Sequence, residues 1–222
     1  MNYEKLSHRV APWVLPILLL AVWQLSVSAG WLSTRILPAP SAVIAAGVHL
    51  VASGEIWTHL AISGWRAGLG FVIGGSIGLA LGFITGLSKW GERLLDSSVQ
   101  MIRNVPHLAL IPLVILWAGL GEVGKIILLF LAALWIMAIA ARSGVSGVRI
   151  SKVHAAYSLG ASKWQIMRHV IIPNSLPDIF TGARVAMGVC WGTVVAAELV
   201  AAEKGAGMMI MVASKFQSTD IV

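Results

Sequence analysis

The sequence predicts an all-α integral membrane protein with about five membrane spans. Hydrophobic residues make up 58% of its 222 positions and charged residues 11%, and the mean hydropathy is +0.86. A soluble domain carries about 25% charged residues, so this chain has too few of them to cover a surface in water. The composition excludes a soluble enzyme of ordinary make-up, a disordered chain and a collagen-like fibre.

Five stretches are apolar over most of the ~20 residues that a helix needs to cross a bilayer. The first follows Lys5 and Arg9, as in a signal peptide, but its apolar part exceeds the usual length of about 7–15 residues and more spans follow. We therefore expect an uncleaved first helix. The tail 207–222 is too short and too polar to be a sixth span. The five stretches are 11–29, 67–87, 105–120, 124–141 and 180–202.

The basic residues predict the orientation, because cytoplasmic loops carry an excess of Lys and Arg. The richer side includes the N-terminus, which we therefore place in the cytoplasm. This asymmetry also explains the net charge of +7 better than nucleic-acid binding does. The cytoplasmic side holds Lys5, Arg9, Lys89, Arg93, Arg103, Arg142, Arg149, Lys152, Lys163, Arg168 and Arg184, and the outer side holds Arg35, Arg66, Lys125, Lys204 and Lys215.

The chain divides into two parts. Residues 1–63 contain the first span and an outside segment, in which 42–51 predicts a short interfacial helix. Residues 64–222 contain the other spans and the longest cytoplasmic loop.

A stripe of glycines runs along the second span at intervals of four residues. Such a pattern lets another helix approach closely, and close approach is a main source of helix affinity in lipid. Either the bundle itself or a partner subunit would supply that second helix. The stripe consists of Gly70, Gly74, Gly78, Gly82 and Gly86.

Two strings look catalytic but lack the context that the chemistry needs. Residues 74–78 match G-x-S-x-G, yet they lie in mid-span and not in a strand-to-helix turn. Residues 119–125 begin like a phosphate-binding loop, but Ile126 stands where Ser or Thr is required. We interpret 119–125 as a tight turn between the third and fourth spans. The histidines are scattered without metal-ligand spacing, so we expect no metal site.

Polar residues at membrane depth are candidates for a translocation path. Arg103, Asn104 and His107 open the third span, and Glu198 lies near the outer end of the fifth. Glu198 would either line an aqueous path or reach the outer interface. The arginines at span ends, Arg66 among them, are interpreted as anchors that extend toward the membrane surface.

The cytoplasmic loop 151–177 predicts two short helices. The first ends at Gly160, and the second runs from Ser162 to about Ile171 and ends before Pro173. Their partly apolar surfaces need a cover, either the lipid surface or a cytoplasmic protein.

Residues in this loop follow the EAA motif of ATP-binding-cassette (ABC) importer permeases. The loop thus resembles the coupling loop that those permeases insert into a groove of their ATPase subunits. His154 replaces the Glu of the motif, which removes any salt bridge made there and leaves the small residues, glycine break and proline stop. The matching positions are His154, Ala155, Ala156, Gly160, Val170, Ile172 and Pro173.

The resemblance extends over nearly the whole chain. Segments 30–38, 90–96 and 103–117 resemble permeases of aliphatic sulfonate importers, and 196–202 and 218–220 resemble the wider taurine, nitrate and sulfonate group. This implies the transmembrane domain of a type I ABC importer, with its core at 64–222 and a sixth span missing or truncated.

The function implied by the resemblance is that of a permease subunit for aliphatic sulfonates in a bacterial inner membrane. It implies a homodimer, two ATP-binding subunits and a soluble substrate-binding protein, with ATP and Mg²⁺ on the partner subunits and no cofactor on this chain. Taurine, nitrate or another small anion is the alternative cargo. A stand-alone channel or secondary transporter would need paired charges or broken helices at membrane depth, and an intramembrane enzyme would need a catalytic constellation there.

Overall fold

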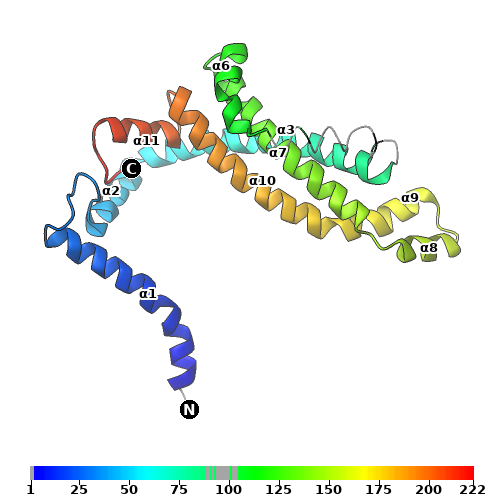
Figure 1. Ribbon diagram of the computed structural model, residues 1–222, viewed down its shortest axis with the longest axis horizontal. Helices are drawn as coiled ribbons and strands as arrows, with labels where there is room; N and C mark the ends of the chain where they lie inside the picture. The colour runs from blue at the N-terminus through cyan, green and yellow to red at the C-terminus, as the bar shows by residue number, and fades with distance from the viewer. Residues whose placement is uncertain (1–2, 89–90, 92, 94–100, 102–104) are drawn as a thin grey trace. The chain divides into compact units, whose positions relative to one another are not determined.

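The computed structural model of the protein describes residues 3–88, 91, 93, 101 and 105–222 (Figure 1). Every regular element in these ranges is a helix, which confirms the predicted all-α class. The chain forms two compact units, one of residues 1–59 and 209–222 and one of residues 60–208.

The first unit begins with α1 (Tyr3–Ser28), whose apolar part is almost entirely uncovered by other residues. A helix that is apolar all round and unburied is suited to lipid. The helix predicted over 42–51 is present within α2 (Pro40–Ser53). Pro40 suits the first turn of α2 because its missing N–H needs no partner there, and Gly54 ends α2 with a left-handed φ of 78°.

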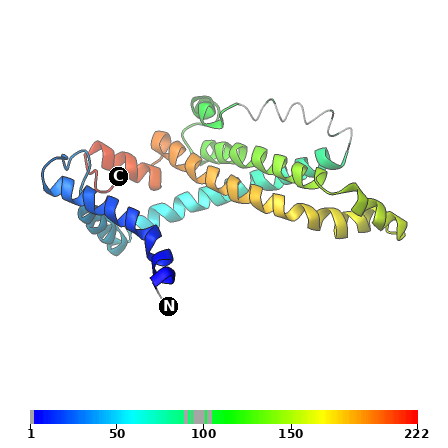
Figure 2. The same ribbon diagram turned by 60° about the horizontal axis from the view of Figure 1, so that its bottom comes forward.

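The second unit is built around α7 (Glu122–Ser146), which packs lengthwise against α10 (Ile172–Ala201) (Figure 2). Its core contains residues from three helices, α3 (Glu55–Leu87), α7 and α10. Most of these side chains are small, so the helix backbones lie close together. The core residues are Ala67, Leu129, Ala132, Ala133, Cys190 and Val194.

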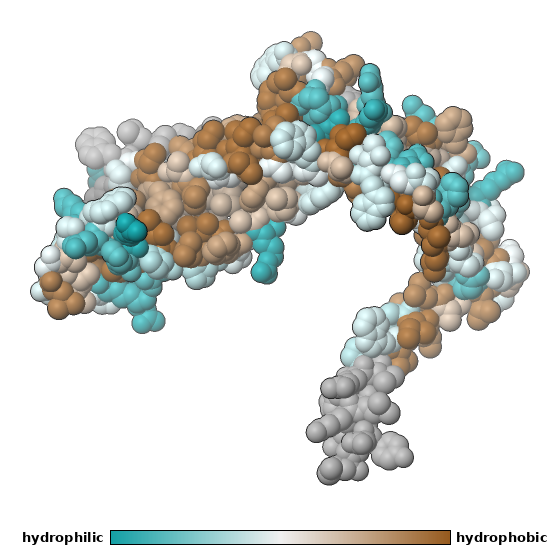
Figure 3. Space-filling view, turned by 180° about the vertical axis from the view of Figure 1, so that it is seen from behind, coloured by the Kyte–Doolittle hydropathy of each residue, from teal (hydrophilic) through white to brown (hydrophobic). Residues whose placement is uncertain are grey.

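Four helical stretches in the described ranges are long and apolar enough to cross a membrane: 11–28, 55–87, 122–146 and 163–200. Apolar side chains cover much of their outer surface, whereas hydrophilic ones gather at the end formed by α8 (Ile150–Ser158) and α9 (Lys163–Ile166) (Figure 3). The second of these helices begins at Glu55, well before the predicted span at 67, because residues 55–66 contain no proline to interrupt it.

The third predicted span, 105–120, takes a shorter form than expected. It contains a 3₁₀ turn, η2 (His107–Leu110), and the short helix α6 (Ile111–Ala118). Gly119 ends α6 with a φ of 75°. The predicted turn over 119–125 is shorter than expected, because α7 already begins at Glu122.

The prediction that Pro173 ends a helix is wrong. After α9 the chain makes one wider turn, the π-helix η3 (Met167–Ile171), and continues into α10 as one helical stretch. Pro173 lies in the first turn of α10, where the wider turn removes the usual conflict between the proline ring and the preceding carbonyls. The fifth span therefore begins well before Phe180.

Candidate functional site

A network of mostly buried charges joins α3 to the start of α7 and the end of α10, at positions that the sequence places toward the outer side. Arg66 on α3 has a side chain that is only 5% exposed. Its Nε and Nη2 each donate a 2.6 Å hydrogen bond to one carboxylate oxygen of Glu122, at the start of α7. Its Nη1 donates to Glu198 Oε1 and to the backbone oxygen of Lys204, both at 2.6 Å. The guanidinium thus connects α3, α7 and α10.

The Glu198 carboxylate is fully enclosed by hydrogen-bond donors. Besides Arg66, the hydroxyl of Ser63 donates to it at 2.8 Å and the backbone N–H of Gly207 at 2.9 Å. The Ser63 oxygen in turn accepts a 2.9 Å bond from the N–H of Ala206. Buried charges are stable only when they are paired and hydrogen-bonded in this way. The network therefore also holds the start of α11 (Ala206–Lys215).

Glu122 is the exposed member of the network. Its side chain is 55% exposed, whereas that of Lys125 is 6% exposed. The Lys125 Nζ donates a 3.0 Å hydrogen bond to Glu122 Oε1. One outward-facing carboxylate is thus held by two buried cations, Arg66 and Lys125. We call Ser63, Arg66, Glu122, Lys125 and Glu198 the charge network.

The charge network changes how Arg66 and Glu198 are interpreted. Arg66 is not an anchor that extends to the membrane surface, because two carboxylates distant in sequence draw it into the bundle. Glu198 does not reach the outer interface in this structure, since its side chain is buried. Sequence reasoning missed Glu122, although Arg66, Lys125 and Glu198 were all predicted at the outer side. Their shared placement at the outer side of the membrane is the signal that would have suggested their pairing.

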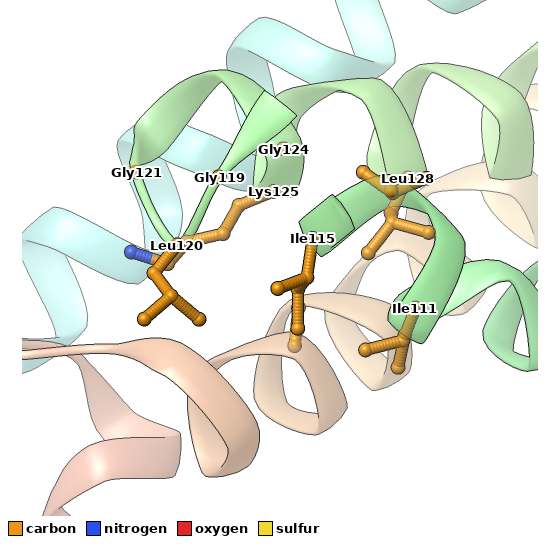
Figure 4. Close-up of a pocket in the computed structure, with 10 residues that line it drawn as sticks. Ile111, Ile115, Gly119, Leu120, Gly121, Gly124, Lys125 and Leu128 are labelled. Carbon is orange, nitrogen blue, oxygen red and sulfur yellow. The ribbon is translucent and has the colours of Figure 1, made fainter. Parts of the chain in front are cut away.

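A small apolar pocket lies beside Lys125, between α6, α7 and α10 (Figure 4). The Lys125 stem borders it, and the amino group at its tip points away from Ile111 and Ile115 (Figure 4). Its cavity volume is only about 10 Å³, which is roughly the room that one water molecule needs. Its lining consists of Ile111, Val114, Ile115, Gly119, Leu120, Gly121, Gly124, Lys125, Leu128 and Ala197.

The other candidates for a translocation path are placed separately. His107 Nε2 lies 2.9 Å from the hydroxyl of Thr193 on α10. Arg103 and Asn104 lie outside the described residues. His107 therefore contacts α10 through Thr193, whereas Glu198 lies on α10 itself and contacts Arg66.

The five glycines of the stripe all face α7. A Cβ atom added at Gly86 would lie 2.9 Å from Val145 Cβ, and one added at any of the other four would lie closer still to its neighbour on α7. Such distances leave no room for a side chain, so the partner helix is inside this bundle. The facing pairs are Gly70 with Leu129, Gly74 with Phe130, Gly78 with Leu134, Gly82 with Ala138 and Gly86 with Val145.

The residues of the EAA-like motif lie on α8, in the turn after it, on η3 and at the start of α10. Gly160 separates α8 from α9 with a φ of +80°, which favours glycine. Ser162 caps α9: its hydroxyl accepts from Gln165 N at 3.3 Å while Gln165 Oε1 accepts from Ser162 N at 2.7 Å. We call residues 150–171 the hairpin.

The hairpin presents large apolar side chains to the surroundings. Leu159 is 89% exposed and Trp164 is 68% exposed. His154 and Ala155 are also exposed, and Ala156, Gly160 and Val170 line a shared hollow. Exposed apolar groups beside hydrophilic ones are typical of a protein-binding surface.

Spans packed through a glycine stripe, a buried charge network and an exposed hairpin define a helical membrane protein of the transport class. Residues 74–221 match the family described as "Binding-protein-dependent transport system inner membrane component". The chain belongs to this family and is a membrane-spanning permease subunit of an ABC transport system.

Individual relatives agree with this assignment. The chain is 54% identical over 219 residues to the "Putative aliphatic sulfonates transport permease protein SsuC" of Escherichia coli (strain K12), covering 99% of this chain and 83% of that protein. It is 37% identical to the taurine transport system permease protein TauC of the same strain, covering 99% and 86%. Among solved structures, an inward-facing MetNI methionine ABC transporter matches with a TM-score of 0.57 and 22% identity, covering 77% of this chain and 84% of that one. The last comparison shows the fold alone.

Proposed function

We propose that this permease subunit carries aliphatic sulfonates into a bacterial cell. The observation that carries the proposal is the 54% identity to a relative named for aliphatic sulfonates, over nearly the whole chain. The 37% identity to a taurine permease supports the same class, because taurine is itself a small sulfonate. A soluble binding protein would deliver the anion to the outer side.

The hairpin is the proposed docking site for the ATP-binding subunits. Its exposed Leu159 and Trp164 need a protein cover, and its turn is shaped by Gly160 and the Ser162 cap. A single helical stretch, 163–200, then connects the hairpin to Glu198 in the charge network. Movement of the hairpin on ATP binding would therefore reach the outer end of the bundle through one continuous helix.

The proposed assembly has two copies of this chain, two ATP-binding subunits and one binding protein. The N-terminus and the hairpin lie in the cytoplasm, and the charge network lies at the outer side. ATP and Mg²⁺ bind to the partner subunits, which perform the hydrolysis. This chain contributes the path and the coupling surface.

Growth on defined sulfur sources tests the cargo. A strain lacking this chain should fail to grow on ethanesulfonate or butanesulfonate as the only sulfur source and should grow normally on sulfate. Growth should return when the chain is supplied again together with its partner subunits. Normal growth of the deletion strain on every alkanesulfonate, with loss of growth on taurine or of nitrate use, would assign the cargo to that anion.

ATP dependence separates an ABC permease from a channel or secondary transporter. Vesicles containing the complete assembly should accumulate radiolabelled butanesulfonate only with internal ATP and external binding protein. Uptake that proceeds without ATP would contradict the coupling role of the hairpin.

A further inference from the structure

The charge network has the composition of a site for a small anion. We propose that Arg66 and Lys125 bind the sulfonate group of the substrate and that Glu122 occupies the anion position until substrate displaces it. This inference rests on the proposed sulfonate transport and names the residues that would perform the recognition.

The Glu122 carboxylate lies among three hydrogen-bond donors. Its carboxylate accepts two hydrogen bonds from the Arg66 fork, both at 2.6 Å, and one from Lys125 Nζ at 3.0 Å. A sulfonate also presents oxygens on one small charged group, which suits a planar arginine fork and a point-charged ammonium. The position of the Glu122 carboxylate is therefore a position for an anion.

The charges of the network balance only while an anion occupies the Glu122 position. Arg66 and Lys125 carry two positive charges, and Glu122 and Glu198 carry two negative charges. When Glu122 swings away, one positive charge remains unbalanced on groups that are 5% and 6% exposed. An unpaired buried charge is costly, so a singly charged anion would restore the balance. Sulfonates carry that single charge throughout the physiological pH range.

The two carboxylates of the network differ in how firmly they are held. Glu198 is buried and accepts bonds from Ser63, Arg66 and the backbone of Gly207. Glu122 is 55% exposed, and its carboxylate accepts from the side chains of Arg66 and Lys125. Glu122 can thus rotate outward without breaking backbone contacts, and Glu198 stays as the fixed partner of Arg66.

The test uses the complete assembly of permease and ATP-binding subunits, without the binding protein. Calorimetric titration with butanesulfonate should detect binding to the wild-type assembly. Lys125→Met keeps the stem and removes the charge, and should weaken binding by about tenfold or more. Lys125→Arg should retain binding, and Glu122→Gln, which removes the competing charge, should strengthen it. Arg35→Gln removes a cation predicted at the outer side but outside the network, and should leave binding unchanged.

A second variant decides the proposal if Lys125→Met fails to assemble. Glu122→Gln should bind butanesulfonate more tightly than the wild-type assembly, because the competing charge is gone. Unchanged or weaker binding by Glu122→Gln would then overturn the proposal.

Failure of the site and failure of the function give different results. Wild-type uptake of butanesulfonate together with unchanged affinity and uptake in Lys125→Met and Glu122→Gln would overturn this site and leave sulfonate transport standing. Absence of any ATP-dependent sulfonate uptake by the wild-type assembly would overturn both.

Discussion

Arg66 Nη1 donates a 2.6 Å hydrogen bond to Glu198 Oε1, although the two residues are 132 positions apart in the chain. Both side chains are buried. The pair ties the middle of α3 to the end of α10, and the N–H groups of Ala206 and Gly207 extend the tie to α11. This end of the second unit is thus closed by polar contacts, whereas its middle is closed by small residues.

Replacing Glu198 tests the stabilising role of this pair. Glu198→Leu leaves the Arg66 charge with fewer partners and the Gly207 N–H without its acceptor. Removing one member of a buried pair costs roughly 3–5 kcal/mol, so we expect a clear fall in the unfolding temperature of the purified protein in detergent. Glu203→Leu, at an exposed position nearby, should change the free energy of unfolding by about 0.5 kcal/mol or less. Equal unfolding temperatures for the two variants would contradict the role assigned to the pair.

The glycine stripe provides a matched pair of substitutions on one helix. At Gly78 an added Cβ would meet the backbone of α7, whereas at Gly68 it would meet nothing within 4 Å. Gly78→Leu should therefore separate α3 from α7 and lower the yield and unfolding temperature of the protein, by an amount equivalent to about 1–3 kcal/mol of overpacking. Gly68→Leu should be tolerated. The measurement is thermal unfolding in detergent, and similar behaviour of both variants would refute the packing interpretation.

Gly160 links the shape of the hairpin to coupling. Its φ of +80° costs a residue with a Cβ about 1–2 kcal/mol, and a β-branched side chain is least compatible with it. Gly160→Val should leave the membrane bundle as stable as wild type while reducing both the ATP-binding subunits retained on purification and the uptake of sulfonate. Asn tolerates the left-handed region, so Gly160→Asn should keep most of both. Transport at the wild-type rate in Gly160→Val would exclude the hairpin turn as a coupling element.

Labelling in intact cells tests the orientation. Cys190 is the single cysteine and is buried, so Cys190→Ala provides a background without reactive thiols. Both Glu55 and Lys163 are exposed, which makes Glu55→Cys and Lys163→Cys equally reactive in detergent. A membrane-impermeant maleimide added outside should label only Glu55→Cys. The reverse pattern would invert the topology and move the hairpin to the outside.

Local patterns in the sequence predicted much of the fold. The helix at 42–51 and the break at Gly160 depend on proline and glycine chemistry within one or two turns, which is readable without any partner. The apolar runs predicted the membrane class because composition alone decides that a helix prefers lipid. The four-residue spacing of the glycines likewise predicted a close helix contact before its partner was known.

Tertiary structure decided what those local patterns left open. Only packing shows that α7 faces the glycine stripe, because every span is apolar enough to be a partner. Only the folded chain brings Arg66 within reach of Glu122 and Glu198, since a charge near a span end has the same sequence pattern whether it meets lipid headgroups or a buried carboxylate. The wide turn before Pro173 is also a product of context: the local signal favours a helix stop, and the continuous packing of η3 and α10 in the second unit overrides it. Sequence by itself therefore determined the class of the protein and its local turns, and the three-dimensional structure determined which side chains meet, because pairing depends on distances that no local pattern encodes.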